Sequence, residues 1–167
     1  MKFARILSIM VLGVMLSSSA FAKELKVGYV DLSRLFDNYQ KTKEFDAALQ
    51  KQGESFTKDR DGMIAKIRDA QGKLALLKEE EKNKLGESIE KQKTDLIEYD
   101  KQKRTELAKQ RDEKVREILL EIEKIVSDLA KKEGYDYILN DRVLVYGDQT
   151  QNITDRVLKI LNDSYKK

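Results

Sequence analysis

The sequence predicts an α+β protein in which a long antiparallel coiled-coil helical hairpin projects from a small body of strands and short helices. Three observations lead to this fold class. Residues 41–132 contain no proline, and 44 of these 92 residues are charged, 23 basic and 21 acidic. Apolar residues recur along this segment at the spacing of a coiled coil. The flanking segments, 23–40 and 133–167, instead have the texture of short strands, turns and helices.

The first 22 residues have the pattern of a secretory signal peptide. Lys2 and Arg5 precede an apolar run at 6–16, and the motif at 20–22, Ala-Phe-Ala, supplies a cleavage pattern. A membrane anchor is the alternative, but this apolar run is well short of the ~20 residues that a spanning helix needs. We therefore expect export, cleavage after Ala22 and a soluble mature protein.

The amino-acid composition excludes several classes of functional site. Removal of residues 1–22 takes away two of the 33 basic residues and leaves 31 against 30 acidic ones, so overall charge does not favour nucleic-acid binding. The chain has no His and no Cys, which removes the commonest general base, the usual zinc ligands, any disulfide and any lipid anchor on cysteine. The carboxylates alternate with Lys and Arg, as on a solvated helix face. We expect no catalytic residue, no metal and no cofactor.

Two apolar stripes predict the helices of the hairpin. On the first helix, the stripe repeats every seven residues, and on the second it repeats every eleven. The first comprises Leu49, Phe56, Met63, Ala70 and Leu77, with Ile67 and Leu74; the second comprises Leu85, Leu96, Leu107, Ile118 and Leu129, with Ile89 and Ile122. Apolar residues become dense from Val115 to Leu129, so this end should pack against more than one partner.

A fold-back is expected near the middle of this segment. One continuous helix of 41–132 would be about 138 Å long, and a hairpin of about 65 Å is more economical. The most turn-like stretch is 83–88, which contains Gly86. The alternative is that Gly86 is tolerated inside one continuous helix.

The flanks predict the body. Lys26–Leu32 has the pattern of a strand, followed by an N-cap at Ser33 and a short helix over 34–39. Gly134 suits the left-handed residue that ends the second long helix. A β-hairpin should follow, with strands at 135–140 and 143–146, and then a helix capped by Asn152. The resulting body of 23–40 and 133–167 is too small to be stable alone, so we expect self-association.

The chain resembles the Skp/OmpH family of periplasmic chaperones along its whole mature length. The motifs are Lys-Val-Gly-Tyr-Val-Asp-Leu-Ser-Arg-Leu-Phe from residue 26, Gly-Tyr-Asp-Tyr-Ile-Leu from 134, Val-Leu-Val-Tyr-Gly-Asp from 143 and Ile-Thr-Asp-Arg-Val-Leu-Lys-Ile-Leu-Asn from 153. The resemblance implies a homotrimer with a β-barrel-forming body, whose hairpins surround a cavity for unfolded outer-membrane β-barrel proteins, held without ATP. The strand residues expected to form the trimer are Val27, Tyr29, Val30, Tyr137, Ile138, Leu139, Val143, Leu144, Val145 and Tyr146.

Client contact requires apolar surface that is accessible but thin. The candidates are Met63, Ile64, Ile67, Leu74, Leu77, Leu85 and Ile89. Their alternative role is to seal the hairpin, which we favour for Ile67, Leu74 and Leu77. Ile64 follows Met63 directly and cannot share its direction, so it is the best candidate for an outward contact.

A basic band and four glycines complete the candidate sites. The band is Lys101, Lys103, Arg104, Lys109 and Arg111, which we expect to attract clients, an anionic membrane surface or lipopolysaccharide. The band lies nearer the body than the arm tip does. Arm tips of the family are described as basic, whereas residues 78–93 of this chain carry five basic and five acidic residues. No aromatic residues alternate with this band, which argues against nucleic acid.

The glycines are expected to give the arm flexibility, because each costs about 1 kcal/mol in a helix. They are Gly53, Gly62, Gly72 and Gly86, and close helix contact is the alternative for Gly53. For the protein as a whole, the alternative function is a coiled-coil structural spacer or adaptor of the cell envelope.

Overall fold

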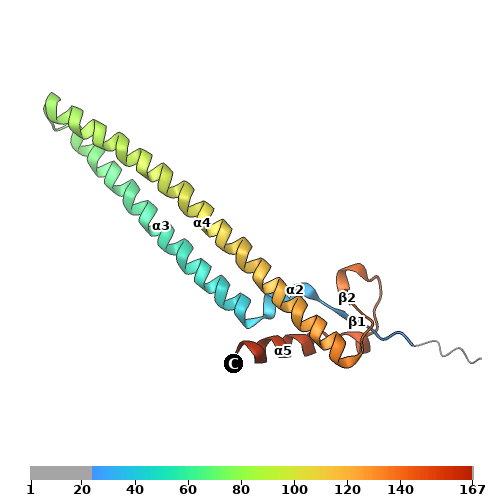
Figure 1. The fold of residues 1–167 in the computed structure, drawn as a ribbon. Coiled ribbons are helices and arrows are strands. Elements are labelled where there is room, and N and C mark those ends of the chain that lie inside the picture. Colours follow the sequence, from blue (N-terminus) through green and yellow to red (C-terminus); the bar gives the residue numbers. More distant parts are fainter. Residues whose placement is uncertain (1–23, 167) are drawn as a thin grey trace, which may run out of the picture.

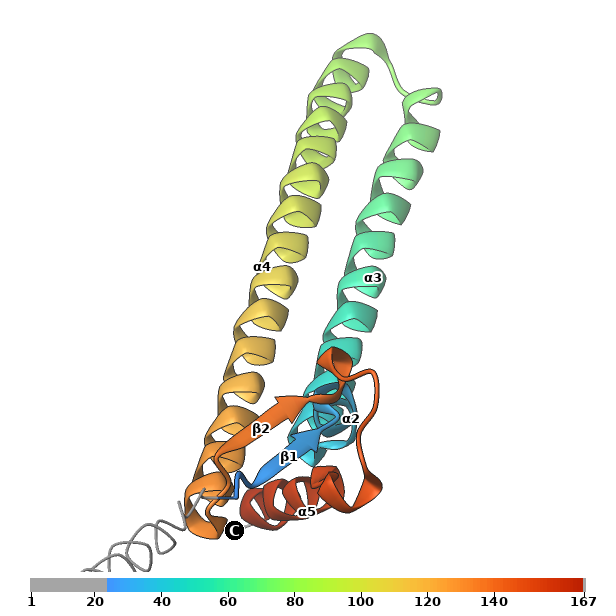
Figure 2. The same ribbon diagram turned by 90° about the vertical axis from the view of Figure 1, so that its right-hand side faces the viewer.

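The protein is mostly helical, with one long arm and a small mixed base. The computed structural model describes residues 24–166, so the predicted signal peptide and its cleavage after Ala22 lie outside the described residues. In chain order the elements are β1 (Val27–Val30), α2 (Leu32–Asn38), α3 (Gln40–Leu74), α4 (Glu79–Glu133), β2 (Tyr137–Asn140), the 3-10 helices η2 (Asp141–Val143) and η3 (Gln149–Gln151), and α5 (Thr154–Tyr165). α3 and α4 form the arm, and the other elements gather at one end of it (Figures 1 and 2). Within 24–166, no helix has the length and apolarity to cross a bilayer.

The arm folds back as predicted, but the predicted position of the turn at 83–88 is wrong. α3 ends at Leu74 and α4 begins at Glu79, so Gly86 lies inside α4. The first turn of α4 holds three consecutive glutamates, 79–81. Negative charge at a helix N-terminus is stabilised by the helix dipole. This favours a start at 79, whereas a glycine inside a helix costs only about 1 kcal/mol.

The two predicted apolar stripes lie on the sides of the helices that pack. Every residue in both stripes is buried or half-buried. Among the stripe residues, Ile67 and Ile89 in the outer half and Ile118, Ile122 and Leu129 towards the base are buried, and the others are half-buried. The arm is therefore a thin two-helix seam rather than a full core.

The apolar-rich end of α4 packs into the body, as predicted from the width of its apolar stripe. β1, α2 and α5 gather around this end of α4 (Figure 2), and one buried cluster joins them to it. Its members are Val30, Leu35, Tyr39, Ile118, Ile122, Leu129, Ile153, Val157 and Leu161. α4 then ends at Gly134, which has the predicted left-handed conformation with a φ of 72°.

The predicted β-hairpin is wrong. β2 pairs in parallel with β1, with Val27 opposite Tyr137 and Val30 opposite Asn140. Because α3 leads away from the body and α4 leads back, the chain re-enters beside β1 in the same direction (Figure 2). After β2, the side chain of Asn140 accepts a hydrogen bond from Arg142 N (3.3 Å) and caps the 3-10 helix η2. The segment 143–146 therefore leaves the sheet instead of forming a second strand.

The helix starts differ slightly from prediction. Asp31, not Ser33, caps α2, because its Oδ1 accepts a hydrogen bond from Arg34 N at 2.7 Å. The final helix α5 begins at Thr154. Its N-cap residue is Ile153, not the predicted Asn152, although Asn152 accepts hydrogen bonds from Thr154 N (3.0 Å) and Thr154 Oγ1 (2.6 Å).

Two glycines allow the body to close around tyrosine rings. A Cβ added at Gly28 would lie 2.9 Å from Cε1 of Tyr135, and one at Gly147 would lie 2.8 Å from Cε1 of Tyr29. Real Cβ atoms do not approach so closely in a packed interior. Both positions therefore require glycine for contact with a neighbour.

Candidate functional site

The arm is anchored to the body by a charged cluster at its base. Lys41 Nζ, on the first turn of α3, lies 2.7 Å from Glu117 Oε1 and 2.8 Å from Glu121 Oε1, both on α4. Tyr39 donates a hydrogen bond to Glu121 Oε2 at 3.2 Å. Burial and the neighbouring carboxylate of Glu121 raise the pKa of Tyr39 to about 12. Hydrogen bonds from Lys114 and Lys41 lower the pKa of Glu117 to about 2. The ion pair between Lys41 and Glu117 therefore stays charged at neutral pH and links α3 to α4.

Halfway along the arm, a shallow groove combines apolar and cationic side chains. Its volume is about 380 Å³. Ile97, which is 68% exposed, lies in this groove beside Ile64 and Leu96. The polar residues that line it are Arg60, Asp100, Lys101 and Arg104. Apolar surface is thus presented to solvent in a small patch with charged edges.

The seven candidate client-contact residues are less exposed than their role would suggest. Ile67 and Ile89 are buried in the seam. The other five, Met63, Ile64, Leu74, Leu77 and Leu85, are half-buried. Ile64 lines the groove, whereas Ile67 and Ile89 are accessible to another chain only if the helices separate.

Two exposed apolar residues in the outer part of the arm, Leu76 and Ile97, were not among the predicted contacts. Leu76 is 85% exposed in the turn at the tip, and Ile97 is the exposed member of the groove. Ile97 follows the stripe residue Leu96 just as Ile64 follows Met63. Ile97 therefore carries the same sequence signal as Ile64.

The basic band is partly neutralised by its own helix. Lys103 pairs with Glu106, Arg104 with Asp100 and Lys109 with Glu113, at 2.7, 2.6 and 3.8 Å. Within the described residues, no ion pair includes Lys101 or Arg111. These two residues are the members of the band with charge available for a partner.

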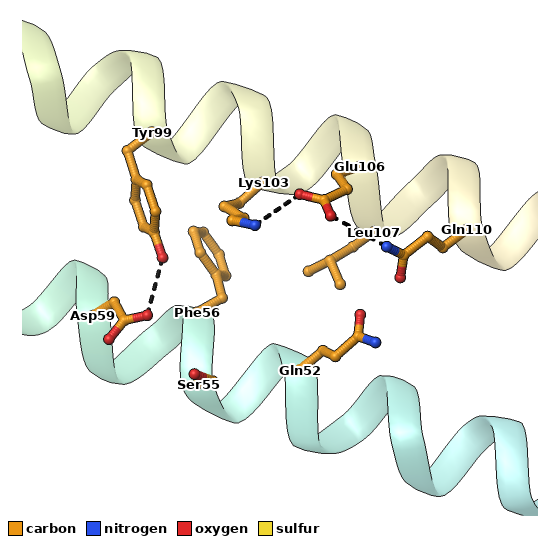
Figure 3. Close-up of a pocket in the computed structure, with 9 residues that line it drawn as sticks. All are labelled: Gln52, Ser55, Phe56, Asp59, Tyr99, Lys103, Glu106, Leu107 and Gln110. Atoms are coloured by element: carbon orange, nitrogen blue, oxygen red, sulfur yellow. Dashed lines mark hydrogen bonds and ion pairs between the residues drawn. The ribbon is translucent and has the colours of Figure 1, made fainter.

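A small cavity lies between α3 and α4 in the middle of the arm (Figure 3). Its volume is about 230 Å³. The residues around it are Gln52, Ser55, Phe56, Asp59, Tyr99, Lys103, Glu106, Leu107 and Gln110. We call it the mid-arm cavity.

The glycines proposed for flexibility lie in open positions. A Cβ added at Gly53, Gly62, Gly72 or Gly86 would meet no atom within 4 Å. Close helix contact, the alternative for Gly53, is therefore wrong. All four lie inside α3 or α4, where their effect is on helix stability alone.

The predicted oligomerisation residues fall into two groups in the protomer. Tyr29 and Val30 are buried, and Val27, Ile138, Leu139 and Leu144 are half-buried. Tyr137, Val143, Val145 and Tyr146 are exposed, and Val145 makes almost no contact with the rest of the protomer. Tyr137 begins β2, whereas Val143, Val145 and Tyr146 lie in the segment after it, and we call these last three exposed residues the apolar loop patch.

Comparisons with known proteins agree with this architecture. The family model described as "Outer membrane protein (OmpH-like)" matches residues 26–161. The chain is 24% identical over 152 residues to the "Chaperone protein Skp" of Yersinia enterocolitica, an alignment that covers 89% of this chain and 93% of that protein. The crystal structure of a Caulobacter crescentus CB15 protein described as OmpH-like superposes with a TM-score of 0.77 at 11% identity, covering 84% of this chain and 85% of the other. At 11% identity, the match to the Caulobacter crescentus structure shows similarity of fold alone.

Proposed function

The chain belongs to the OmpH-like family of outer membrane proteins, and from this membership we propose that it is an ATP-independent holding chaperone of the periplasm. Its clients are unfolded outer-membrane β-barrel proteins, which it keeps from aggregating in transit. The similarity to a chaperone named Skp supports this proposal. The protein needs no catalytic residue or cofactor for such a task, because holding relies on contact alone.

The observation that carries the proposal is the surface of the arm. A holding chaperone needs apolar contacts that a client can reach but that are too small to make the chaperone itself aggregate. Ile97, with Ile64 and Leu96 beside it, meets this requirement in the shallow groove that Arg60 and Lys101 also line, and Leu76 does so at the tip. Lys101 lies in the same groove and adds long-range attraction for acidic segments.

The apolar loop patch supports assembly into a homotrimer through the body. Within residues 24–166 the sheet has two strands, β1 and β2, and one isolated bridge joins Tyr29 to Asn152. Isolated two-stranded sheets are marginal, and exposed apolar residues beside an open edge favour pairing with another chain. Three copies would close these edges into a small barrel, with the arms enclosing a space for the client.

A structural spacer of the envelope shares this fold, so the test must measure client holding. A β-barrel protein denatured in urea is diluted into buffer with and without the mature chain, and aggregation is followed by light scattering. We expect suppression without ATP and one client bound per oligomer by mass. If aggregation is unchanged, the spacer is the better interpretation.

A matched pair of variants places the activity on the arm. Ile97→Gln removes the exposed apolar side chain and should raise the amount of chaperone needed for half-suppression. Gln102→Ala changes another exposed residue of α4 and should leave this amount unchanged. Equal activity of the two variants would place client contact away from the groove.

A further inference from the structure

The mid-arm cavity interrupts the seam where neither helix is tightly packed. Among the described residues, α3 has no buried residue between Thr42 and Ile67, and α4 has none between Ile89 and Ile118. The cavity lies inside this interval and is about as large as seven or eight water molecules. It is smaller than the ~300 Å³ at which pockets for drug-sized ligands begin. Its size suits one large side chain.

The walls of the cavity favour an aromatic side chain over an aliphatic one. Phe56 comes from α3 and Tyr99 from α4, and their ring centroids lie 5.8 Å apart at a tilt of 38° (Figure 3). Leu107 forms the third apolar wall. Aromatic rings prefer offset or edge-on partners at such separations, so a further ring would extend an arrangement that already exists.

The polar groups around the cavity are mostly engaged with one another. Tyr99 donates to Asp59 Oδ2 at 3.2 Å. Lys103 donates to Glu106 Oε2 at 2.7 Å, and Gln110 Nε2 donates to Glu106 Oε1 at 3.2 Å (Figure 3). These bonds leave accepting capacity on the carboxylates of Asp59 and Glu106 and on the amide oxygens of Gln52 and Gln110. An occupant that brings a ring and one hydrogen-bond donor can therefore bond to this wall.

We propose that the mid-arm cavity receives a single tyrosine or tryptophan side chain of an unfolded client. These two side chains combine an aromatic body with one O–H or N–H donor. An extended segment can insert one such side chain while its backbone stays outside. This inference rests on the proposed function only in naming a client as the source of the ring.

The absence of tryptophan from the chain makes the test direct. An unstructured Gly/Ser peptide with one central tryptophan is titrated with the mature oligomer, and tryptophan emission is recorded. We expect a saturable shift to shorter wavelength. The same peptide with tyrosine should compete, whereas the leucine peptide should compete about three- to tenfold more weakly, as expected for an aromatic pair. Equal competition by leucine would overturn the aromatic preference.

Two variants place the binding in the cavity. Ser55→Leu fills the cavity from α3 and should remove most of the emission change. Ala108→Leu adds the same side chain at an exposed position of α4 outside the cavity and should retain it. Circular dichroism checks that both keep their helices. If the native chain leaves the emission unchanged, or if both variants bind equally, the cavity is a hydrated gap and the inference is wrong.

This result is separable from the proposed function. If the native chain suppresses aggregation but does not bind the peptide, only the cavity inference fails. If it binds the peptide with the expected preference but does not suppress aggregation, the cavity inference stands and the holding function fails.

Discussion

Lys41 Nζ lies 2.8 Å from Glu121 Oε1 and thereby joins the first turn of α3 to the part of α4 that enters the body. Lys41 is largely covered, with its side chain 17% exposed, and its second carboxylate partner is Glu117. Burial alone would lower the pKa of Lys41, but its hydrogen bonds to these carboxylates raise it above its ordinary value. The Lys41 ammonium is therefore charged at neutral pH and links α3 to α4 at the base of the arm.

Loss of this charge should weaken the base of the arm. Lys41→Met removes two hydrogen bonds to charged groups, and we expect a loss of about 1 to 2 kcal/mol in the free energy of unfolding. Lys124→Met is the control, because its pair with Asp128 is exposed and should contribute about 0.5 kcal/mol or less. Urea unfolding followed by circular dichroism measures both. Equal losses would mean that the Lys41 cluster has no special role.

The same cluster predicts a dependence on acid. The pKa of Glu117 is depressed to about 2, so this carboxylate contributes stability that is present above its unfolded pKa of ~4.3 and is lost as the pH falls towards 2. Glu117→Gln should therefore be less stable than the native chain at neutral pH, and the difference should vanish near pH 2. Urea midpoints across this range test it, with the exposed Glu123→Gln as control. A difference that stays constant with pH would contradict the assignment.

The arm glycines should be replaceable at no steric cost. Gly62→Ala with Gly72→Ala should stabilise the arm by roughly 1 to 2 kcal/mol, because Ala is the better helix former and nothing lies within 4 Å of either Cβ. Gly134→Ala should destabilise by about 1 to 2 kcal/mol, because its φ is 72°. Thermal unfolding compares them.

Flexibility of the arm is tested with the same double variant. The stiffer arm should hold a narrower range of client sizes, whereas the mass of the oligomer should not change. Holding capacity for a small and a large denatured barrel protein is the measurement. Equal capacity for both would show that Gly62 and Gly72 do not serve client binding.

Assembly through the apolar loop patch can be tested with one charge. Val145→Asp should dissociate the oligomer, because a charge buried without a partner is strongly disfavoured. The protomer should stay folded, since Val145 is fully exposed within it. Gln149→Asp adds the same charge on η3 and is the control. Unchanged sedimentation of Val145→Asp would exclude this patch from the interface.

Two members of the basic band should matter more than the others. Lys101→Gln with Arg111→Gln removes the same charge as Lys103→Gln with Lys109→Gln, but only the second pair has carboxylate partners. We expect the first double variant to capture clients less efficiently at about 0.02 M salt, with the difference largely gone at about 0.5 M, where screening is short-ranged. Equal capture at low salt would place the attraction elsewhere on the arm.

The sequence by itself determined the features that depend on short-range chemistry. The apolar repeats identified the packing sides of both long helices, since side chains three, four, seven and eleven residues apart share a helix face. Gly134 identified the end of α4, because a left-handed residue favours glycine. Two further local signals were present in the sequence but were not used. The glutamates at 79–81 mark the start of α4, and the position of Ile97 next to the stripe residue Leu96 marks an exposed apolar side chain.

Only the tertiary structure decided which segments meet. The motif at 140–142 permits either a hairpin turn or a 3-10 turn, and the choice was made by the return of α4 beside β1, which pairs β2 in parallel. The close approach of Tyr29 to Gly147 joins positions 118 residues apart, so neither residue alone predicts it. The mid-arm cavity likewise depends on the register of α3 against α4. These features arise from contacts between distant residues, and local patterns carry no information about the distance or angle of such contacts.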